Sequence, residues 1–375
     1  MFSVVIATYR REQVLIDTIG SLIPQLAALE APSELLVIDQ SDQHEAATTA
    51  ALQQWQDLGL IGWQRLAKPH LVGAMNQGLR SARGELVLFL DDDIVPLPGL
   101  VQAHHACHAQ YPEAWAVVGQ ILQPGQTPAD RPQRQHRSAF WRDLDFPFHR
   151  TRGAWIENAM AGNLSVKRER ILAIGGFNAS FPPPVASRFE TELAKRIVAA
   201  GGRIRFEPGA ALHHLAAARG GTRSAGSHLT SASPHHGVGD AYFALRCARG
   251  WDRCWYLLRK PFREVRTRFH LRHPWWIPLK FVGELRALGL AWRISRRPPQ
   301  LLPIPAAPAP GPGQDPARDL ALPPGGATSR GTAIRTPGTP DYGSGVFGTT
   351  DLGTTVLDNP DLGNPDLSYP VLDNT

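Results

Sequence analysis

Three consecutive carboxylates, Asp91, Asp92 and Asp93, directly follow the apolar run 86–90. An apolar run of this length predicts a buried strand, so the carboxylates should lie at the mouth of a sheet. Three anions placed there repel one another and lose hydration unless a cation sits among them. A divalent ion bound by one or two carboxylates and by substrate phosphates would meet that need. The alternative is that these carboxylates only cap the helix predicted over residues 97–110.

Two further sets of residues follow predicted strands at the same edge. Asp39 ends the apolar run 35–38, and its carboxylate could accept hydrogen bonds from a base or a ribose hydroxyl. Thr8, Tyr9 and Arg10 follow the first strand, where an aromatic ring and a cation suit a nucleotide base. Each of these residues would also fit an ordinary polar loop.

The second half of the chain supplies two more candidates. Glu190 falls in the first turn of a helix predicted over residues 187–200. Glu192 and Arg196 are four residues apart and can pair on one face of that helix, which leaves Glu190 as a candidate general base. His213 and His214 follow a short apolar segment, and an imidazole there could complete the ligands of a metal. A solvated helix face and a surface or core histidine are the alternatives.

Short apolar segments alternate with amphipathic ones along the first 122 residues. Strands are predicted at residues 2–7, 34–38, 62–66, 85–90 and 116–122, and helices at 12–29, 44–58, 72–82 and 97–110. This alternation predicts an α/β fold with a mainly parallel sheet that helices cover on both faces. Ligands of such sheets bind beyond the carboxyl ends of the strands, where the candidates above are expected.

The rest of the chain is less regular. Residues 123–152 are rich in Pro, Gln and Arg and are predicted to form a long surface loop. Helices are predicted at 167–174 and 187–200, and short strands at 204–206 and 210–213. We expect a first domain over residues 1–240, a basic helical extension over 241–297 and a disordered tail over 298–375, which is rich in Pro, Gly and Asp.

Charge is concentrated in one segment of the chain. Residues 246–297 hold 14 Lys/Arg against three Asp/Glu, together with five of the ten Trp. Lys, Arg and Trp are all favoured at an anionic membrane surface, so this segment could make peripheral membrane contact. A packed helical subdomain with a solvated basic face is the alternative, and nucleic-acid binding is less favoured because no known module is recognisable. Three prolines are expected to divide the segment into short helices: Pro261, Pro274 and Pro278.

Cysteine usage and apolar patterning bear on the compartment. The three cysteines have no metal-ligand spacing and predict no disulfide framework, which fits a reducing compartment. No segment has the roughly 20 apolar residues that span a bilayer, and residues 2–7 are too short for a signal peptide. We therefore expect a cytoplasmic protein, with the basic segment at the inner face of the membrane if it binds lipid.

Several ordered motifs together resemble the family 2 glycosyltransferases of the GT-A fold over about residues 1–223. They are VVIATYR (4–10), ELLVID (34–39), GAMNQGL (73–79), GELVLFLDDD (84–93) and GNLS (162–165) followed by GGFN (175–178). The resemblance implies a Rossmann-like mixed sheet and a DxD metal motif. It implies donor-binding roles for Thr8, Tyr9, Arg10, Asp39, Asn76, Asp91 and Asp92.

The same resemblance implies a metal bound by Asp93 and His214, with His213 as the alternative ligand. Glu190 falls at the position of the catalytic base, where the family usually has Asp, and Phe189 stands where the family often has Glu. The base position therefore carries one extra methylene, and the acidic pair of the family is incomplete here.

The implied reaction is a Mn²⁺- or Mg²⁺-dependent, inverting transfer of a sugar from a nucleotide sugar to an acceptor hydroxyl. The expected acceptor is a glycan or a lipid-linked molecule, in cell-surface polysaccharide or glycoconjugate synthesis. A sugar-nucleotide nucleotidyltransferase is one rival, but it would need a Gly-rich triphosphate loop, and residues 8–11 contain no Gly. A non-catalytic nucleotide-sugar or glycan-binding protein is the other.

Overall fold

The computed structural model describes residues 1–130, 136 and 138–304, so the tail predicted over 298–375 lies outside the described residues from position 305 onward. Nine strands in the described part form one sheet in the order β3-β2-β1-β4-β8-β6-β9-β5, with β7 also paired to β9. Their bounds are β1 Phe2–Thr8, β2 Ser33–Asp39, β3 Gly62–Arg65, β4 Leu86–Leu90, β5 Ile94–Pro96, β6 Ala114–Leu122, β7 Ala154–Ile156, β8 Asn163–Lys167 and β9 Arg203–His214.

Strands β1 to β4, β6 and β9 run in one direction, and β5, β7 and β8 run in the other. The predicted mixed, mainly parallel α/β sheet is therefore confirmed. Register places Thr8 of β1 opposite Asp39 of β2, and Ile6 of β1 opposite Leu90 of β4. Because these strands are parallel, the residues immediately after them meet at one edge, as the sequence predicted.

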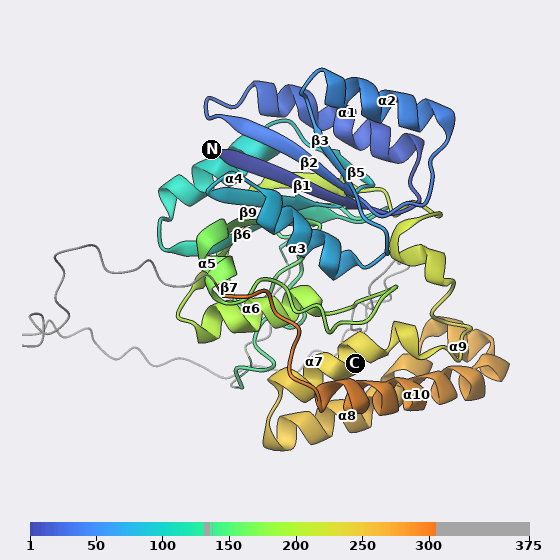
Figure 1. Cartoon of the computed structure of the whole chain (residues 1–375). Coiled ribbons are helices and arrows are strands. Elements are labelled where there is room, and N and C mark those ends of the chain that lie inside the picture. Colours follow the sequence, from blue (N-terminus) through green and yellow to red (C-terminus); the bar gives the residue numbers. More distant parts are fainter. Residues whose placement is uncertain (131–135, 137, 305–375) are drawn as a thin grey trace, which may run out of the picture. The chain divides into compact units, whose positions relative to one another are not determined.

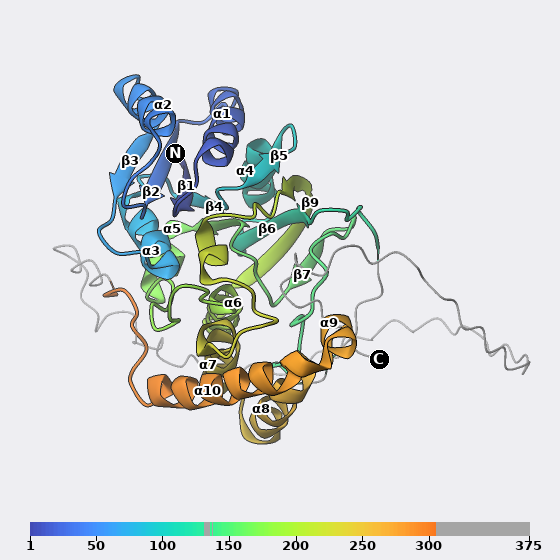
Figure 2. The same ribbon diagram turned by 90° about the vertical axis from the view of Figure 1, so that its right-hand side faces the viewer.

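Helices cover both faces of the sheet (Figures 1 and 2). Helices α1 (Gln13–Ala27), α2 (Ala46–Asp57) and α4 (Leu100–Gln110) lie on one face, while α3 (Leu71–Ser81) and α6 (Phe189–Ala199) lie on the other. Helix α3 packs closely on β1 at Gly78, where an added Cβ would lie 2.3 Å from Cγ1 of Val5. A side chain there would push the helix off the strand.

Some elements differ from the prediction. The helix predicted over 97–110 begins only at Leu100, because β5 precedes it and pairs with β9. The two short strands predicted at 204–206 and 210–213 form one long strand, β9, whose register with β6 shifts between Gly119 and Gln120. The helix predicted over 167–174 is α5 (Arg168–Ala173).

The prediction of a surface loop over residues 123–152 is only partly correct. Its described residues contain no helix or strand, but four apolar side chains are buried in the core: Phe140, Leu144, Phe146 and Phe148. The ring centroid of Phe146 lies 5.0 Å from that of Phe206 on β9. These side chains follow neither a helical nor a strand period, so the sequence pattern did not indicate their burial.

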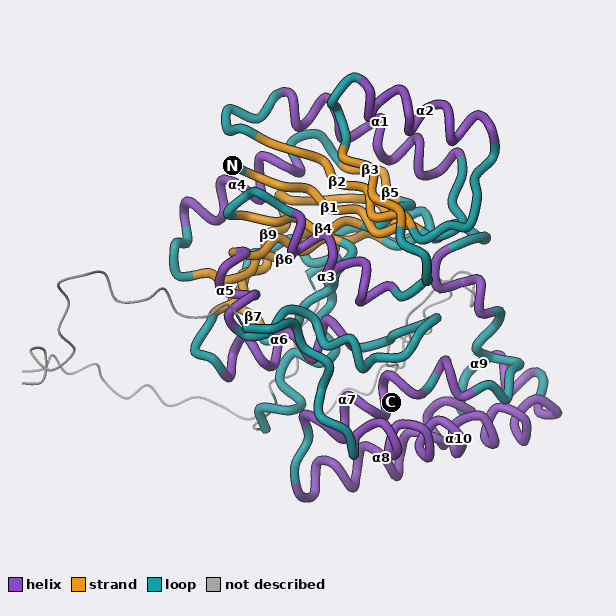
Figure 3. Tube along the Cα trace, in the orientation of Figure 1, coloured by secondary structure: helices purple, strands orange, loops and turns teal. Residues whose placement is uncertain are grey.

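The C-terminal part of the described chain is helical, as expected (Figure 3). It comprises η1 Gly221–Ala225, η2 Pro234–His236, α7 Val238–Cys247, α8 Gly250–Val265, α9 Arg268–Arg272, η3 Pro274–Trp276 and α10 Ile277–Ser295. The domain boundary predicted after residue 240 falls within α7, which packs against α6 and α10. None of the helices in residues 1–304 that the structure describes is long and apolar enough to cross a bilayer.

Proline divides this segment only in part as predicted, because Pro274 begins η3 after α9 but Pro261 does not end α8. Pro261 lies inside α8, and Pro278 begins α10 at a position that tolerates the missing N–H. Buried ion pairs on both sides of Pro261, formed by Lys260 and Arg263, offset the one hydrogen bond that it removes from α8. Tertiary contacts therefore override the local preference.

Candidate functional site

A cavity of about 460 Å³ opens at the carboxyl ends of β1 and β4. This volume lies in the range of small-molecule sites. Several segments line it: residues 7–11 at the end of β1 and directly after it, 69–71 at the start of α3, 91–93 after β4, the pair 183–184, and the residues Gln40, His214, Gly221, Thr222 and Ser224. Of the predicted site residues, seven therefore meet here: Thr8, Tyr9, Arg10, Asp91, Asp92, Asp93 and His214.

The three consecutive carboxylates have different surroundings. The side chain of Asp91 is 49% exposed, whereas Asp92 and Asp93 are buried. Asp92 accepts hydrogen bonds from Oγ1 of Thr8 at 2.8 Å and from Nε of Arg11 at 3.0 Å. Asp93 accepts from Nη2 of Arg11 at 3.0 Å and from the backbone N–H of Ala217 at 2.8 Å.

Arg11 is the residue that the sequence pattern did not reveal. It is buried, joins Asp92 to Asp93, and also donates to the carbonyl oxygens of Ala217 and Arg219. Part of the cation that the acidic run requires is therefore a side chain of the protein. Arg11 stands next to Arg10, and the adjacency of two arginines after β1 was the signal available, although nothing local showed which one turns inward.

The buried carboxylates titrate in opposite directions. Burial raises the pKa of Asp92 to about 6, with Asp93 adding to the rise and Arg11 opposing it. Burial also acts to raise the pKa of Asp93, but the hydrogen bond from His214, the charges of His214 and Arg11, and the N–H of Ala217 outweigh it, so this pKa is lowered. Asp93 is therefore the carboxylate held ionised.

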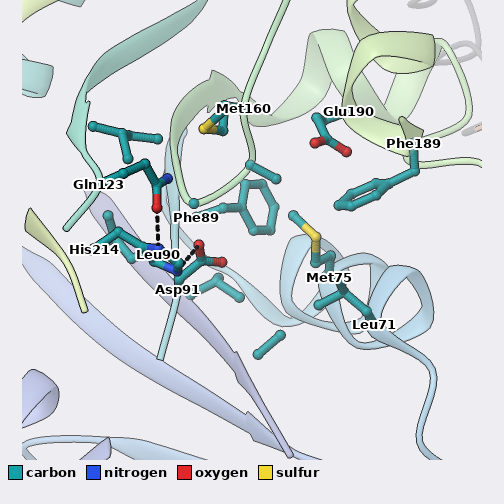
Figure 4. A pocket seen from close by; sticks show the side chains of 15 residues that line it. Leu71, Met75, Phe89, Leu90, Asp91, Gln123, Met160, Phe189, Glu190 and His214 are labelled. Carbon is teal, nitrogen blue, oxygen red and sulfur yellow. Dashed lines mark hydrogen bonds and ion pairs between the residues drawn. The ribbon is translucent and has the colours of Figure 1, made fainter. Parts of the chain in front are cut away.

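Asp91, Asp93 and His214 form a cluster that can hold a metal. One ligand atom from each lies within 4.8 Å of the other two. Nε2 of His214 lies 3.2 Å from Oδ1 of Asp93 and 3.7 Å from Oδ2 of Asp91. On its other side, Nδ1 of His214 lies 2.9 Å from Oε1 of Gln123 (Figure 4).

This arrangement orients the imidazole toward a cation. An amide oxygen can only accept, so the Nδ1 of His214 carries the hydrogen that Gln123 receives. In the neutral ring, the lone pair of Nε2 then faces two carboxylates, which is unfavourable unless a proton or a metal ion lies between them. Metal-binding histidines typically donate a hydrogen bond from the ring nitrogen that does not face the metal, as Nδ1 of His214 does here. The residues present therefore fit a divalent cation.

Pairing of β9 with β5 selects His214 over His213. The register sets His214 opposite Ile94, directly beyond the acidic run, and successive residues of a strand face opposite sides. His213 is exposed on the other side. Gly162 permits the approach of Asp91, because a Cβ at this position would lie 2.2 Å from Oδ2 of Asp91.

Glu190 lines a second, smaller cavity of about 40 Å³. Asp91 and His214 line both cavities, so the two adjoin at the metal cluster. Figure 4 shows Glu190 across the smaller cavity from Asp91, with Met160 and Phe189 on its walls. Oε2 of Glu190 is buried and has no hydrogen-bond partner among the described residues. This burial raises the pKa of Glu190 to about 7.

A buried ionic network holds the segment before Glu190. Nε of Arg188, the residue directly before α6, lies 3.2 Å from Oδ1 of Asp240 on α7. Asp240 also accepts from the hydroxyl of Tyr256 and from Nη2 of Arg263, both on α8. The C-terminal helices therefore help to position the first turn of α6.

Two predicted donor-binding residues are not among the described residues that line the larger cavity. Asp39 is fully buried and accepts from the N–H of Ser41 at 2.8 Å, while its other oxygen lies 3.0 Å from His44 and 3.1 Å from Trp63. Asn76 uses both ends of its amide on the backbone of one residue, Phe177, at 2.8 Å each. In this structure both side chains hold neighbouring loops.

Tyr9 and Arg10 do face the larger cavity. The guanidinium of Arg10 lies 5.0 Å from the ring centre of Tyr9 and pairs with Asp42 at 2.9 Å. Both partners of that ion pair are more than half exposed, so the pair contributes little to stability. The two side chains are thus available to a planar ligand.

Comparison with known proteins adds a family. Residues 3–171 match the model described as Glycosyl transferase family 2. The validoxylamine A glucosyltransferase of Streptomyces hygroscopicus subsp. limoneus is 31% identical over 121 residues, which cover 32% of this chain and 26% of the relative. The chain spans about a quarter of the length of the curated relatives it matches.

Solved structures show a weaker likeness. The mannosyltransferase PcManGT from Pyrobaculum calidifontis, in complex with GDP-Man and Mn²⁺, is 20% identical, with 78% of this chain and 75% of that chain covered and a TM-score of 0.45. GalNAc-T7 with UDP, GalNAc and Mn²⁺ is 17% identical, with 57% and 43% covered and a TM-score of 0.45. A likeness of this strength does not establish a shared function. The match to glycosyl transferase family 2 covers residues 3–171, which include β1, β4 and the acidic run of the site, and this part of the chain is similar to that family.

Proposed function

We propose that this protein transfers a sugar from a nucleoside-diphosphate sugar to an acceptor hydroxyl. The observation that carries the proposal is the meeting of two cavities at Asp91 and His214. The larger cavity has the size and the polar lining for a nucleotide, and the smaller one holds a buried carboxyl group of raised pKa. A donor site and a base on either side of one cation site is the arrangement that glycosyl transfer requires.

Asp91, Asp93 and His214 would hold the divalent cation, Mn²⁺ or Mg²⁺, in this proposal. When bound, the cation would neutralise the charge of the diphosphate. Tyr9 and Arg10 would border the base, while Thr8 and Arg11 would hold Asp92 in place. Direct donor contact by Asp39 or Asn76 stays a prediction, since each side chain would first have to exchange its present hydrogen bonds.

Glu190 would act as the general base. Its pKa of about 7 leaves a substantial ionised fraction near neutral pH, together with a strong affinity for the proton. The carboxylate takes the proton of the acceptor hydroxyl, whose oxygen forms a bond to the anomeric carbon. The bond from that carbon to the diphosphate breaks, and its electron pair leaves with the nucleoside diphosphate. Because entry and departure occur on opposite faces, the configuration inverts.

The acceptor in this proposal is a glycan or a lipid-linked molecule, and the product belongs to cell-surface polysaccharide or glycoconjugate synthesis. Peripheral contact of residues 246–297 with the inner face of a membrane is part of the same proposal. The motif order, the family match and the basic composition of that segment support these statements.

A donor-binding screen followed by one substitution tests the proposal. Thermal shift with a panel of nucleoside diphosphates and Mn²⁺ should show selective stabilisation by one base. Glu190→Gln should then abolish sugar transfer while leaving donor stabilisation unchanged, and Glu30→Gln, which removes an exposed carboxylate, should leave both unchanged. Transfer retained in Glu190→Gln would remove the base assignment. If no nucleoside diphosphate of the panel stabilised the protein, the proposal that the donor is a nucleoside-diphosphate sugar would be rejected.

A further inference from the structure

Helix α8 carries a stripe of exposed apolar side chains. Trp251, Trp255, Leu258 and Phe262 are spaced four, three and four residues apart, so they follow one side of the helix. The side chain of Trp251 is 74% exposed and that of Leu258 is 64% exposed. Large apolar side chains grouped in this way usually mark a binding surface, whereas single exposed ones are normal.

The stripe continues onto η3 and α10. The ring centroid of Phe262 lies 5.5 Å from that of Phe281 on α10, which joins the two helices at the surface. Both helices lie side by side in Figures 1 and 2. Further exposed apolar residues on these elements are Trp275, Leu279, Val282, Leu285 and Trp292. We call the exposed apolar residues of α8, η3 and α10 the apolar face.

Cations surround the apolar face. The guanidinium of Arg259 lies 5.3 Å from the ring centre of Trp255, and that of Arg296 lies 4.9 Å from Trp292. Exposed arginines continue along the same segment at positions 266, 268, 272, 286, 293 and 297. The segment thus combines exposed positive charge with exposed aromatic rings, which is the composition favoured at the interface of an anionic bilayer.

The acidic residues of the segment point inward. Residues 246–297 contain three of them, all described by the structure, and none is exposed. Glu284 is buried between Lys260 and Lys280, Asp252 accepts from Ser138 and Trp141, and Glu264 pairs with Arg263. The exposed charge of this segment is therefore positive, with no exposed carboxylate within it to offset the arginines.

These observations favour one occupant. A second copy of the chain would bring arginine against arginine, which costs energy wherever the two apolar faces meet. Nucleic acid would engage the arginines but would leave exposed leucine and valine side chains without a partner. A lipid surface provides a partner for the apolar side chains and for the arginines. The apolar side chains contact the acyl chains, and the arginines pair with anionic headgroups. We infer that the apolar face docks the protein on the surface of an anionic lipid bilayer.

This inference deepens the membrane contact within the proposed function by naming the surface and the lipid charge, and it does not rest on the sugar-transfer reaction. It is tested by binding alone, without turnover, using the full chain. Wild-type protein should sediment with vesicles that contain phosphatidylglycerol and not with vesicles of phosphatidylcholine alone. Raising the salt concentration should weaken the binding, because headgroup attraction is screened.

A double substitution identifies the surface. The double substitution Trp251→Ser with Leu258→Ser should lower vesicle affinity on the order of tenfold or more, because it removes apolar side chains that would be buried in the bilayer. Leu58→Ser on the end of α2, where the leucine is also 64% exposed, is the matched control and should bind as the wild type does. A cooperative thermal unfolding transition of the double variant, at a melting temperature close to that of the wild type, shows that its fold is intact.

Equal sedimentation of wild type and the double variant would overturn the inference. So would equal binding to neutral vesicles, or retention on duplex DNA without retention on anionic vesicles. Failure of the donor screen with normal vesicle binding would count against the proposed function alone, which keeps the two conclusions separable.

Discussion

Replacing Glu190 with Gln should stabilise the protein at alkaline pH. The pKa of this buried carboxyl is about 7, against a usual value of 4.5. In the folded state the group therefore keeps its proton to higher pH than in the unfolded chain. The free energy of unfolding should fall by about 3 kcal/mol in total as pH rises from about 4.5 to about 7. Above pH 7 the ionisation of Glu190 should lower it no further.

The glutamine side chain has nearly the same shape and carries no charge at any pH, so the variant should lack this loss. Near pH 5, wild type and Glu190→Gln should unfold at similar temperatures. Near pH 8, the variant should have the higher melting temperature, by roughly 5–10 °C for a difference of about 3 kcal/mol.

Thermal unfolding should be measured at both pH values with a chelator present, since a bound cation would favour the ionised carboxylate. The surface substitution Glu30→Gln removes the same formal charge and controls for net-charge effects. A melting-temperature difference that does not change between the two pH values would refute the reasoning, because burial of Glu190 would then not disfavour its charge. Equal stability of variant and wild type at both values would refute it as well.

The contacts of the site lead to four further expected outcomes. Arg11→Met should lower the free energy of unfolding by about 3–5 kcal/mol in a urea titration, because it leaves two buried carboxylates without their cation. His214→Ala should weaken Mn²⁺ binding roughly tenfold or more by calorimetry, whereas His213→Ala should not. Asn76→Ala should cost about 1–3 kcal/mol of stability with donor affinity retained, and a selective loss of donor affinity would instead favour a direct donor contact. Asp240→Asn should lower both stability and the transfer rate, since it breaks the ionic network behind α6, and an unchanged rate would show that the network is only structural.

Much of the site could be predicted because its residues come directly after parallel strands. The apolar runs 2–7, 35–38 and 86–90 form β1, β2 and β4, and parallel pairing brings the residues after each run to one edge. The acidic run therefore had to meet Thr8 whatever the remaining fold. The histidine was predicted only as one of two, because strand alternation sends His213 and His214 to opposite sides and pairing with β5 decides between them.

By itself, the sequence determined the α/β class, the order of strands and helices up to residue 122 apart from β5, and the common edge where Thr8, Asp91 and Asp93 lie. These features depend on periodicity and on parallel pairing, which are local or nearly so. Only the tertiary structure decided that Arg11 neutralises part of the acidic run, that Asp39 and Asn76 are engaged with their neighbours, and that α8 continues through Pro261. Arg11 and Asn76 depend on contacts between residues far apart in the chain, with Asp92 and with Phe177. In all these cases burial and pairing of charges or polar groups outweigh the local preferences that a sequence displays.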